Sequence, residues 1–344
     1  SVDLRHNVTT PVTIGVSSSN PATVPGSNTL CRSGAGALST AACTLSFSDS
    51  GFLIDMPDKL ANKAQNATIS AVRKSNDNLE CVPTFAGQTK RVDLWSQYIS
   101  PVAASMFTPT AVSVNSTSIS GSSASPSSQN LTFDASGKAT IAVNYSDAGK
   151  VELNAKYTGV AGTPDEGLVM IGSDPFVSFP VGLCITPKDS GALCPAGDVS
   201  CAVYKKAGES FNLQIAAKAW VIDNDSNYCD NPSTPNYVQS GIALSSQLVA
   251  PSPGAQGEVG IASYDQVAAT NNLNTVVQSI SEVGIFTFSA APPASYLGSS
   301  FYSIPLAKSA NIGRFVPDRF GVTNPSVLPA CSTSFSYMDQ NFVV

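Results

Sequence analysis

Oxygen-bearing side chains are concentrated in one stretch of the sequence, VIDNDSNYCDNPSTPNY, at residues 221–237. Asp223, Asp225 and Asn227 follow the D-x-D-x-N alternation that directs oxygen ligands towards one Ca²⁺ in calcium-binding loops. Asp230 is placed to add a further oxygen. The residue types and their spacing therefore indicate a candidate calcium site.

The rest of an EF-hand loop is missing from this stretch. Tyr228 stands at the sixth position, where glycine is needed, and Thr234 stands at the twelfth, where glutamate is needed. A polar loop between two strands, pinned by Cys229, explains the same residues without a metal. We favour the loop and keep Ca²⁺ as the alternative, and the sequence indicates no other cofactor.

Catalytic motifs are missing from the sequence. A nucleophilic triad needs an imidazole base, and the one histidine, His6, lies in an alternating segment typical of a strand. No GxGxxG, GxxxxGKS/T, HExxH or GxSxG motif occurs in the context that each requires. Paired carboxylates for glycoside hydrolysis are recognised by their separation in space, which a sequence does not give. We predict that the chain is not an enzyme.

The charge balance argues against nucleic acid as a partner. The 344 residues carry a net charge of −6, with an isoelectric point of about 4.7, and no basic stripe is present to neutralise phosphates. No run reaches the roughly 18 apolar residues that a membrane-spanning helix needs, so we expect no membrane insertion. The chain starts at Ser1 in a strand pattern, so we expect either a removed leader or a piece of a longer protein.

Cysteine usage indicates an oxidising compartment. An even number of cysteines in an acidic, Ser/Thr-rich chain favours disulfides, and the spacings typical of zinc sites are missing. Only local pairs can be predicted, because eight cysteines allow 105 pairings. We predict the pairs Cys31–Cys43 and Cys194–Cys201. The remaining cysteines are Cys81, Cys184, Cys229 and Cys331.

A short motif, an acidic residue followed two places later by glycine and then by a strand pattern, occurs three times. The copies are Asp49 with Gly51, Asp147 with Gly149 (preceded by Tyr145), and Glu282 with Gly284. An aspartate accepts hydrogen bonds from nearby backbone amides, and glycine adopts conformations that other residues avoid. We therefore interpret the motif as a structural corner where the chain crosses between the sheets of a sandwich.

The spacing of the corners predicts a repeated domain. Asp147 follows Asp49 by 98 residues, about the length of one immunoglobulin-like (Ig-like) domain, and Glu282 follows Asp147 by 135. Short strand-like runs separated by Gly, Pro, Asn and Ser clusters agree with this interpretation. We predict an all-β fold of tandem Ig-like β-sandwich modules. The intersheet cysteine pair and core tryptophan of antibody domains are not in register here, which leaves the topology open.

The expected modules divide the chain into four parts. Residues 1–61 hold the late strands of one module, 62–172 form a complete sandwich, 173–308 form a larger sandwich, and 309–344 begin a further module. A lone half-sandwich leaves a sheet edge and an apolar face bare. We therefore expect either missing flanking sequence or completion of each half-module by a neighbouring copy.

Four stretches carry a resemblance to a known family. They are CTLSFSDSGFLIDMPD, ATISAVRKSNDNLECVPTFAG, LTFDASGKATIAVNYSDAGKVELNAKY and IGRFVPDRFGV. They resemble the large C-terminal region of MshQ-type proteins, which are encoded with bacterial mannose-sensitive haemagglutinin type IV pili. The resemblance covers nearly the whole chain and implies a bacterial surface protein with a role in pilus assembly or adhesion. It supplies no catalytic residues.

The predicted function is that of a non-catalytic extracellular structural or adhesive protein associated with a type IV pilus or surface fibre. One alternative is a self-polymerising fibre subunit, and another is a Ca²⁺- or carbohydrate-binding module centred on residues 223–230. The expected partners are pilus or fibre subunits, further copies of the chain, and a receptor that the sequence does not identify.

Overall fold

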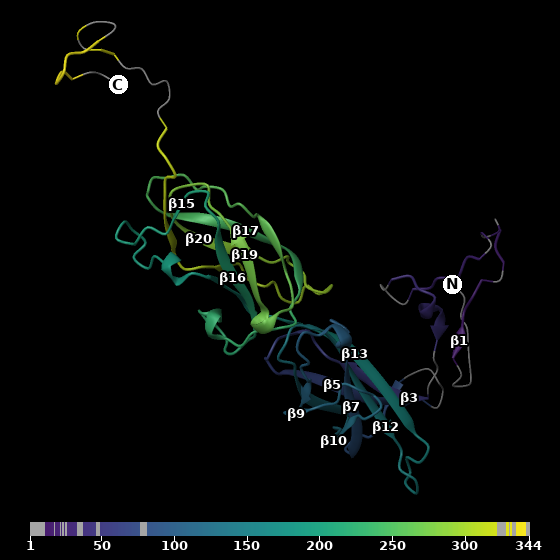
Figure 1. Cartoon of the computed structure of the whole chain (residues 1–344). Helices are drawn as coiled ribbons and strands as arrows, with labels where there is room; N and C mark the ends of the chain where they lie inside the picture. Colours follow the sequence, from purple (N-terminus) through teal and green to yellow (C-terminus); the bar gives the residue numbers. More distant parts are fainter. Residues whose placement is uncertain are drawn as a thin grey trace. The chain divides into compact units, whose positions relative to one another are not determined.

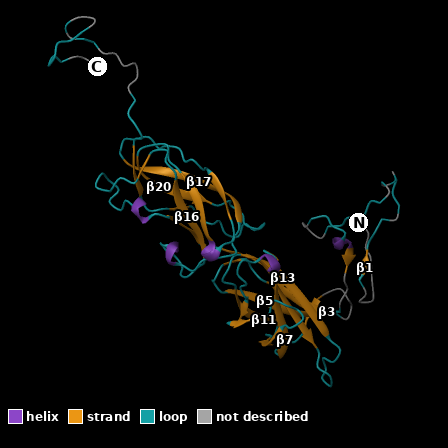
Figure 2. Cartoon of the chain, in the orientation of Figure 1, coloured by secondary structure: helices purple, strands orange, loops and turns teal. Residues whose placement is uncertain are grey.

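The computed structural model folds into two compact units, one of residues 1–179 with 297–301 and the other of residues 180–296 with 302–344. Figure 1 shows that both are built from strands, and Figure 2 shows that helical structure is confined to short turns. The residues described are 11–16, 18–20, 22, 24, 26–32, 37–45, 49–75, 81–321, 328–329, 331 and 335–341. His6 lies outside them.

The first unit is a sandwich of two sheets. One sheet has the strand order β10-β7-β12-β13-β4, and the other has the order β3-β5-β11-β8-β9 with β6 added beside β5. The strands are β3 (Ser50–Asp55), β4 (Lys59–Leu60), β5 (Gln65–Lys74), β6 (Cys81–Pro83), β7 (Thr89–Ser100), β8 (Ser113–Val114), β9 (Thr117–Ser118), β10 (Ser127–Thr132), β11 (Lys138–Asn144), β12 (Gly149–Thr158) and β13 (Val169–Phe179).

Alternating side chains explain why these strands form a sandwich. Val92 and Leu94 of β7 and Leu153 of β12 are fully buried and face Ile69 of β5 and Ile141 of β11 across one apolar core. Successive residues of a strand point to opposite faces of the sheet, so the polar neighbours of these residues point to solvent. Burial of the apolar faces, worth roughly 25 cal/mol per Å², is the main stabilisation of such a core.

The second unit repeats this architecture. Its sheets have the orders β14-β16-β19 and β15-β22-β20-β17-β18, with β21 beside β20. Phe211 of β16 packs against Phe288 of β20 and Phe315 of β22, with ring centroids 5.2 and 5.4 Å apart. The strands are β14 (Gly182–Pro187), β15 (Lys205–Lys206), β16 (Phe211–Lys218), β17 (Gln239–Ala250), β18 (Ser263–Gln266), β19 (Leu273–Gln278), β20 (Gly284–Ala291), β21 (Ala307–Lys308) and β22 (Ile312–Val316).

The last long strand of each sandwich has the same two kinds of partner. β13 pairs in parallel with the short strand β4 in the first unit, and β22 pairs in parallel with β15 in the second. Each of these late strands also pairs antiparallel with its predecessor, β12 or β20. The all-β fold of tandem Ig-like sandwiches predicted from the sequence is confirmed.

The expected division into four parts does not follow the strand pairing. β3, expected in a separate module, pairs with β5 of the first sandwich, and β22, expected to open a further module, closes the second. The boundary expected at residue 172 falls within β13. These pairings join residues far apart in the sequence, which a local strand pattern does not reveal. β3 and β22 thus find partners in their own units, while the small sheet of β1 (Val12–Thr13) and β2 (Thr44–Leu45) is separate from the sheets of both sandwiches.

Two of the three corner motifs open equivalent strands. Gly149 begins β12 with φ +150°, and Gly284 begins β20 with φ +136°. Tyr145 and Asp147 are both 1% exposed, and Asp147 accepts a hydrogen bond from the Ala148 backbone N–H at 2.8 Å. Both corners thus place the start of a central strand tightly against its neighbour.

The other acidic residues of the motif lie in different settings. Gly51 lies inside the edge strand β3, opposite Val72 of β5, and Asp49 forms an exposed ion pair with Lys74 at 2.6 Å. Glu282 is half-buried before β20. The motif of Asp49 and Gly51 therefore belongs to an edge strand and does not cross between sheets.

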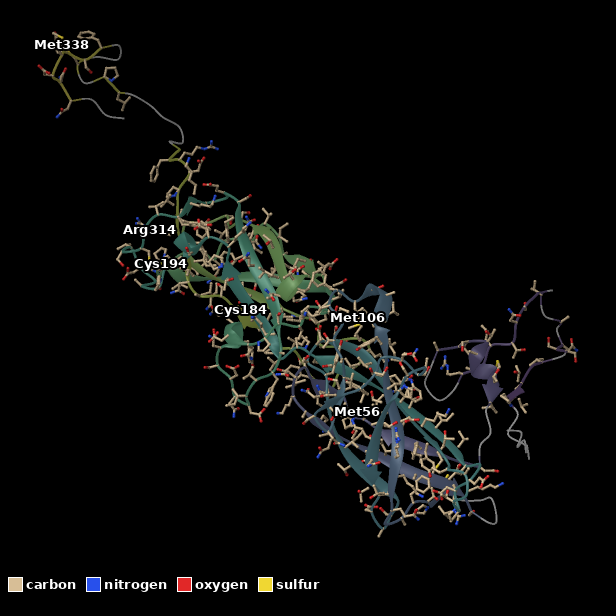
Figure 3. The ribbon with its side chains drawn as sticks, turned by 60° about the horizontal axis from the view of Figure 1, so that its bottom comes forward. Met56, Met106, Cys184, Cys194, Arg314 and Met338 are labelled. Carbon is tan, nitrogen blue, oxygen red and sulfur yellow. A yellow bond between two sulfur atoms is a disulfide. The ribbon has the colours of Figure 1, made fainter. Side chains whose placement is uncertain are left out.

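Three disulfides staple the described chain. Cys31–Cys43 and Cys194–Cys201 have the pairing predicted from the sequence, and the third bond, Cys184–Cys229, was not predicted. Cys31–Cys43 lies beside the small sheet of β1 (Val12–Thr13) and β2 (Thr44–Leu45). The others belong to the second unit, where Figure 3 labels Cys184 and Cys194.

Removal of the Cys184–Cys229 bond is expected to destabilise the second unit by about 2–4 kcal/mol, because the bond closes a long loop in the unfolded chain. The double variant Cys184→Ser with Cys229→Ser should lower the denaturant midpoint of this unit. The equivalent double variant of Cys194 and Cys201, whose sequence separation is 7 rather than 45, should lower it less. Equal losses for both would contradict the loop-length argument.

Candidate binding face of the first unit

The predicted calcium residues are held by hydrogen bonds within their own loop. The Asp225 carboxylate accepts from the Asn227 backbone N–H at 2.9 Å, and the Asp230 carboxylate accepts from the Asn227 amide at 2.7 Å. Asp223 accepts from the Trp220 indole N–H at 2.9 Å. Within the described ranges, no group of three or more His, Cys, Asp or Glu side chains is arranged to hold a metal ion. The D-x-D-x-N spacing here shapes a polar loop.

A different region of the chain brings polar and aromatic groups together. We use the name β7 face for the outward side chains of three neighbouring strands. These are Arg91, Asp93, Trp95 and Gln97 of β7, Ser128 and Asn130 of β10, and Asn154 and Lys156 of β12, of which Asn154 is only 8% exposed. Strand pairing sets their positions, because Ser128 and Lys156 flank Asp93 on either side, and Asn154 lies opposite Trp95.

Trp95 is the aromatic group of the β7 face. Its neighbours Leu94 and Ser96 are both 0% exposed and point into the core, so Trp95 points outwards and is half-buried. Within the part of the chain that the structure describes, its indole has neither a hydrogen-bond nor a ring partner. The Trp95 side chain therefore contributes no intersheet packing.

A serine-rich loop borders Trp95. Trp95 forms an isolated bridge with Ser120, whose backbone N–H donates to the Ser127 hydroxyl at 3.0 Å. The Ser122 backbone N–H donates in turn to the Ser120 hydroxyl at 3.1 Å. Hydroxyl groups thus fix the shape of the loop and line this margin of the β7 face.

A hollow of about 650 Å³ continues from the β7 face to the ends of β7 and β12. Arg91, Asp93 and Ser128 belong to both, and the loop of residues 159–168 forms the far wall. The Asp93 carboxylate accepts a hydrogen bond from the Ser128 hydroxyl. The hollow therefore carries a cation, an anion and hydroxyl groups side by side.

A largely buried ion pair anchors the wall of the hollow. The Asp165 carboxylate binds the Lys90 ammonium and also accepts from the Tyr157 hydroxyl at 2.7 Å. Lys90 lies 4.7 Å from the ring centroid of Phe85, a cation–π distance. The hydrogen bond from Lys90, followed by that from Tyr157, lowers the pKa of Asp165. Burial, with the neighbouring Asp165, raises the pKa of Tyr157 to about 12, so the tyrosine stays neutral at physiological pH.

Backbone hydrogen bonds complete this anchoring of the loop. The Gly159 N–H donates to the Leu168 carbonyl at 2.8 Å, and the Leu168 N–H donates to the Asp165 carbonyl at 2.9 Å. The tip exposes Val160, whose exposed fraction is 59%. The loop therefore presents its surface in a fixed shape, which lowers the entropy cost of binding.

The β7 face was not predicted from the sequence. The signal for this face in the sequence is a tryptophan on the polar side of the alternating strand TKRVDLWSQ. An apolar side chain at that position does not pack into the core. Recognising that signal requires the register of β7, β10 and β12, because the neighbours of Trp95 come from three separate stretches of the chain.

The two sandwiches and their matching strand order define the chain as a tandem Ig-like β-sandwich protein. Models of the three successive domains of a domain family of unknown function, DUF6701, match residues 28–173 (described as its first Ig-like domain), 179–275 (second) and 282–344 (third). The chain belongs to this family. The comparison with curated proteins found no match.

Bacterial adhesins are among the solved structures to which the chain is similar. They are the Yersinia pseudotuberculosis adhesin InvE (14% identity, TM-score 0.35), the integrin-binding protein invasin (12%, 0.31) and a C-terminal intimin fragment in complex with the intimin-binding domain of its translocated receptor (10%, 0.30). The matches cover 77%, 78% and 79% of this chain and 58%, 39% and 65% of those chains. The fold assignment rests on the strand pairing and the family models.

Proposed function

We propose that the chain is a non-catalytic protein of a bacterial surface, with a structural or adhesive role in a type IV pilus or another surface fibre. The observation that carries the proposal is the tandem of Ig-like sandwiches together with three disulfides, two in the second unit and one beside the β1–β2 sheet. Disulfides form and persist outside the reducing cytoplasm, so their number supports an extracellular location. The resemblance to MshQ-type proteins supports the association with a pilus.

The β7 face and the 159–168 loop are the proposed contact surface of this protein. Loops and sheet faces carried on a rigid sandwich are common places for recognition, because the scaffold fixes their shape. The proposed partners are fibre subunits and a receptor on another surface. In the described ranges, no helix is both long and apolar enough to span a membrane.

Polymerisation by exchange of half-modules is not favoured. That alternative depended on incomplete modules at both ends of the chain, and β3 and β22 instead pair within their own units. A fibre assembled from this chain would then use contacts other than the exchange of β3 or β22.

Immunogold labelling of intact bacteria that encode the chain tests the proposed function. We expect gold particles on the cell surface or along fibres, and weaker attachment of a deletion strain to surfaces. The purified protein should migrate faster on a gel before reduction than after it, because its disulfides keep it compact. Protein confined to the cytoplasm with reduced cysteines would overturn the proposal.

A further inference from the structure

The composition of the β7 face differs from that of an ordinary solvated sheet face. Solvent-facing positions of a strand are usually filled by polar residues, as in Arg91 and Asp93, and a tryptophan there exposes apolar area without adding to the core. A flat indole beside hydrogen-bonding groups matches a ligand that has both an apolar face and polar edges.

The charges of the β7 face restrict the class of ligand. Arg91 and Lys156 supply two cations, and Asp93 and the nearby Glu152 of β12 supply two anions. Neither sign dominates, so the face does not attract a strongly ionic ligand such as a nucleic acid or a polyanion. A neutral ligand with many hydroxyl groups fits this balance.

The hydrogen-bonding geometry agrees with such a ligand. A guanidinium presents donors in a fixed fork, and a carboxylate accepts through two oxygens, so each can engage two adjacent hydroxyl groups of a sugar. Arg91 and Asp93 are two residues apart on one strand and therefore point from the same face, and Trp95 follows at the next such position. The serine-rich loop beside Trp95 and the hollow beyond Arg91 extend the polar surface in both directions.

We propose that the β7 face of the first unit binds a neutral oligosaccharide, with one sugar ring stacked on Trp95 and neighbouring hydroxyl groups bonded to Arg91 and Asp93. The next sugar of the ligand lies in the hollow against the 159–168 loop. The inference rests on the proposed extracellular function and adds the chemical class of the ligand.

The test applies the full chain to a printed array of neutral and acidic oligosaccharides and follows each hit by titration calorimetry. We expect binding to neutral oligosaccharides. Trp95→Ala should weaken it about tenfold or more, as for an aromatic residue at the centre of an interface. Asp93→Asn, which keeps the shape but removes the charge, should also weaken it. Leu53→Ala is the matched control, because Leu53 is a 59%-exposed apolar residue on β3 of the opposite sheet.

Each variant is first checked for an unchanged unfolding midpoint, so a loss of binding is not a loss of fold. Binding to acidic glycans alone, binding that survives Trp95→Ala, or an array without hits would each overturn the inference. If the protein is found on the surface but binds no glycan, this inference is contradicted and the proposed function is not. If the protein is found in the cytoplasm, the proposed function is contradicted, even when the array shows glycan binding.

Discussion

Replacement of Gly149 by alanine is expected to destabilise the first unit by about 2–4 kcal/mol. Its φ of +150° is one that side-chain-bearing residues rarely adopt, and an added Cβ would lie 2.7 Å from the Ser100 carbonyl oxygen. That oxygen belongs to the backbone of β7, the strand paired with β12, so it cannot move aside without disturbing the sheet. Backbone strain and overpacking each cost roughly 1–3 kcal/mol.

The second unit offers an internal repeat of this experiment. A Cβ on Gly284 would lie 2.4 Å from the Ala250 carbonyl oxygen, at a φ of +136°. Gly87 and Gly208 are the matched controls, because each has a positive φ but no atom within 4 Å of an added Cβ. Alanine at these two positions should cost only about 1 kcal/mol.

The two tryptophans of the chain allow each unit to be followed separately. Trp95 lies in the first unit and Trp220 in the second, so urea unfolding in a Trp220→Phe background reports the first unit through Trp95 fluorescence. The Trp95→Phe background reports the second. A Gly149→Ala protein no less stable than the Gly87→Ala control would show that the corner relaxes around a side chain.

The corners at Gly149 and Gly284 could be predicted from the sequence because their signal is local. A glycine that starts a strand after a buried turn is visible as a short string, and YSDAGKV and ISEVGIF both place such a glycine at the start of a central strand. The string SDSGF around Gly51 has the same acid-x-Gly spacing, but its glycine lies inside the edge strand β3. Only the pairing partners separate the two cases.

The module boundaries and the β7 face depend on contacts between distant residues. β4 pairs in parallel with β13 and β15 pairs in parallel with β22, in each case across more than a hundred residues, and no local pattern encodes such a partner. The buried Lys59 of β4 shows the same limit, because its side chain ends among oxygens of another stretch of the chain. Sequence patterns thus predicted the class of fold and missed the places where separate strands assemble a site.

Lys59 is expected to make the stability of the first unit depend on pH. Its side chain is 1% exposed, and the ammonium group donates to the Leu60 and Tyr145 carbonyls at 2.8 and 3.0 Å and to the Asn144 side-chain oxygen at 3.3 Å. Burial lowers the pKa of Lys59 from its usual 10.5 to about 7. The folded chain therefore releases the Lys59 proton at a lower pH than the unfolded chain does.

The sign of the effect follows from proton counting. Between pH 7 and 10.5 the unfolded chain holds about one more proton at Lys59 than the folded chain, so the free energy of unfolding rises with pH in this window, by up to about 1.4 kcal/mol per pH unit. Below pH 7 both states are protonated, and above pH 10.5 both are neutral, so the Lys59 contribution is constant there. Burial of the charged form is thus a cost at low pH that is relieved as the pH rises.

Urea unfolding of the wild type and of Lys59→Met at several pH values between 6 and 10, followed through Trp95 in the Trp220→Phe background, measures this contribution. We expect the free energy of unfolding of the wild type to rise with pH more steeply than that of Lys59→Met. Lys150→Met, at a half-exposed lysine of β12, controls for the loss of one positive charge and should follow the wild type. Parallel profiles for wild type and Lys59→Met would mean that Lys59 stays charged in the core. The three surrounding oxygens would then solvate the ammonium as well as water does, and β4 would be held to the corner at Tyr145, between β11 and β12, by a permanent charge.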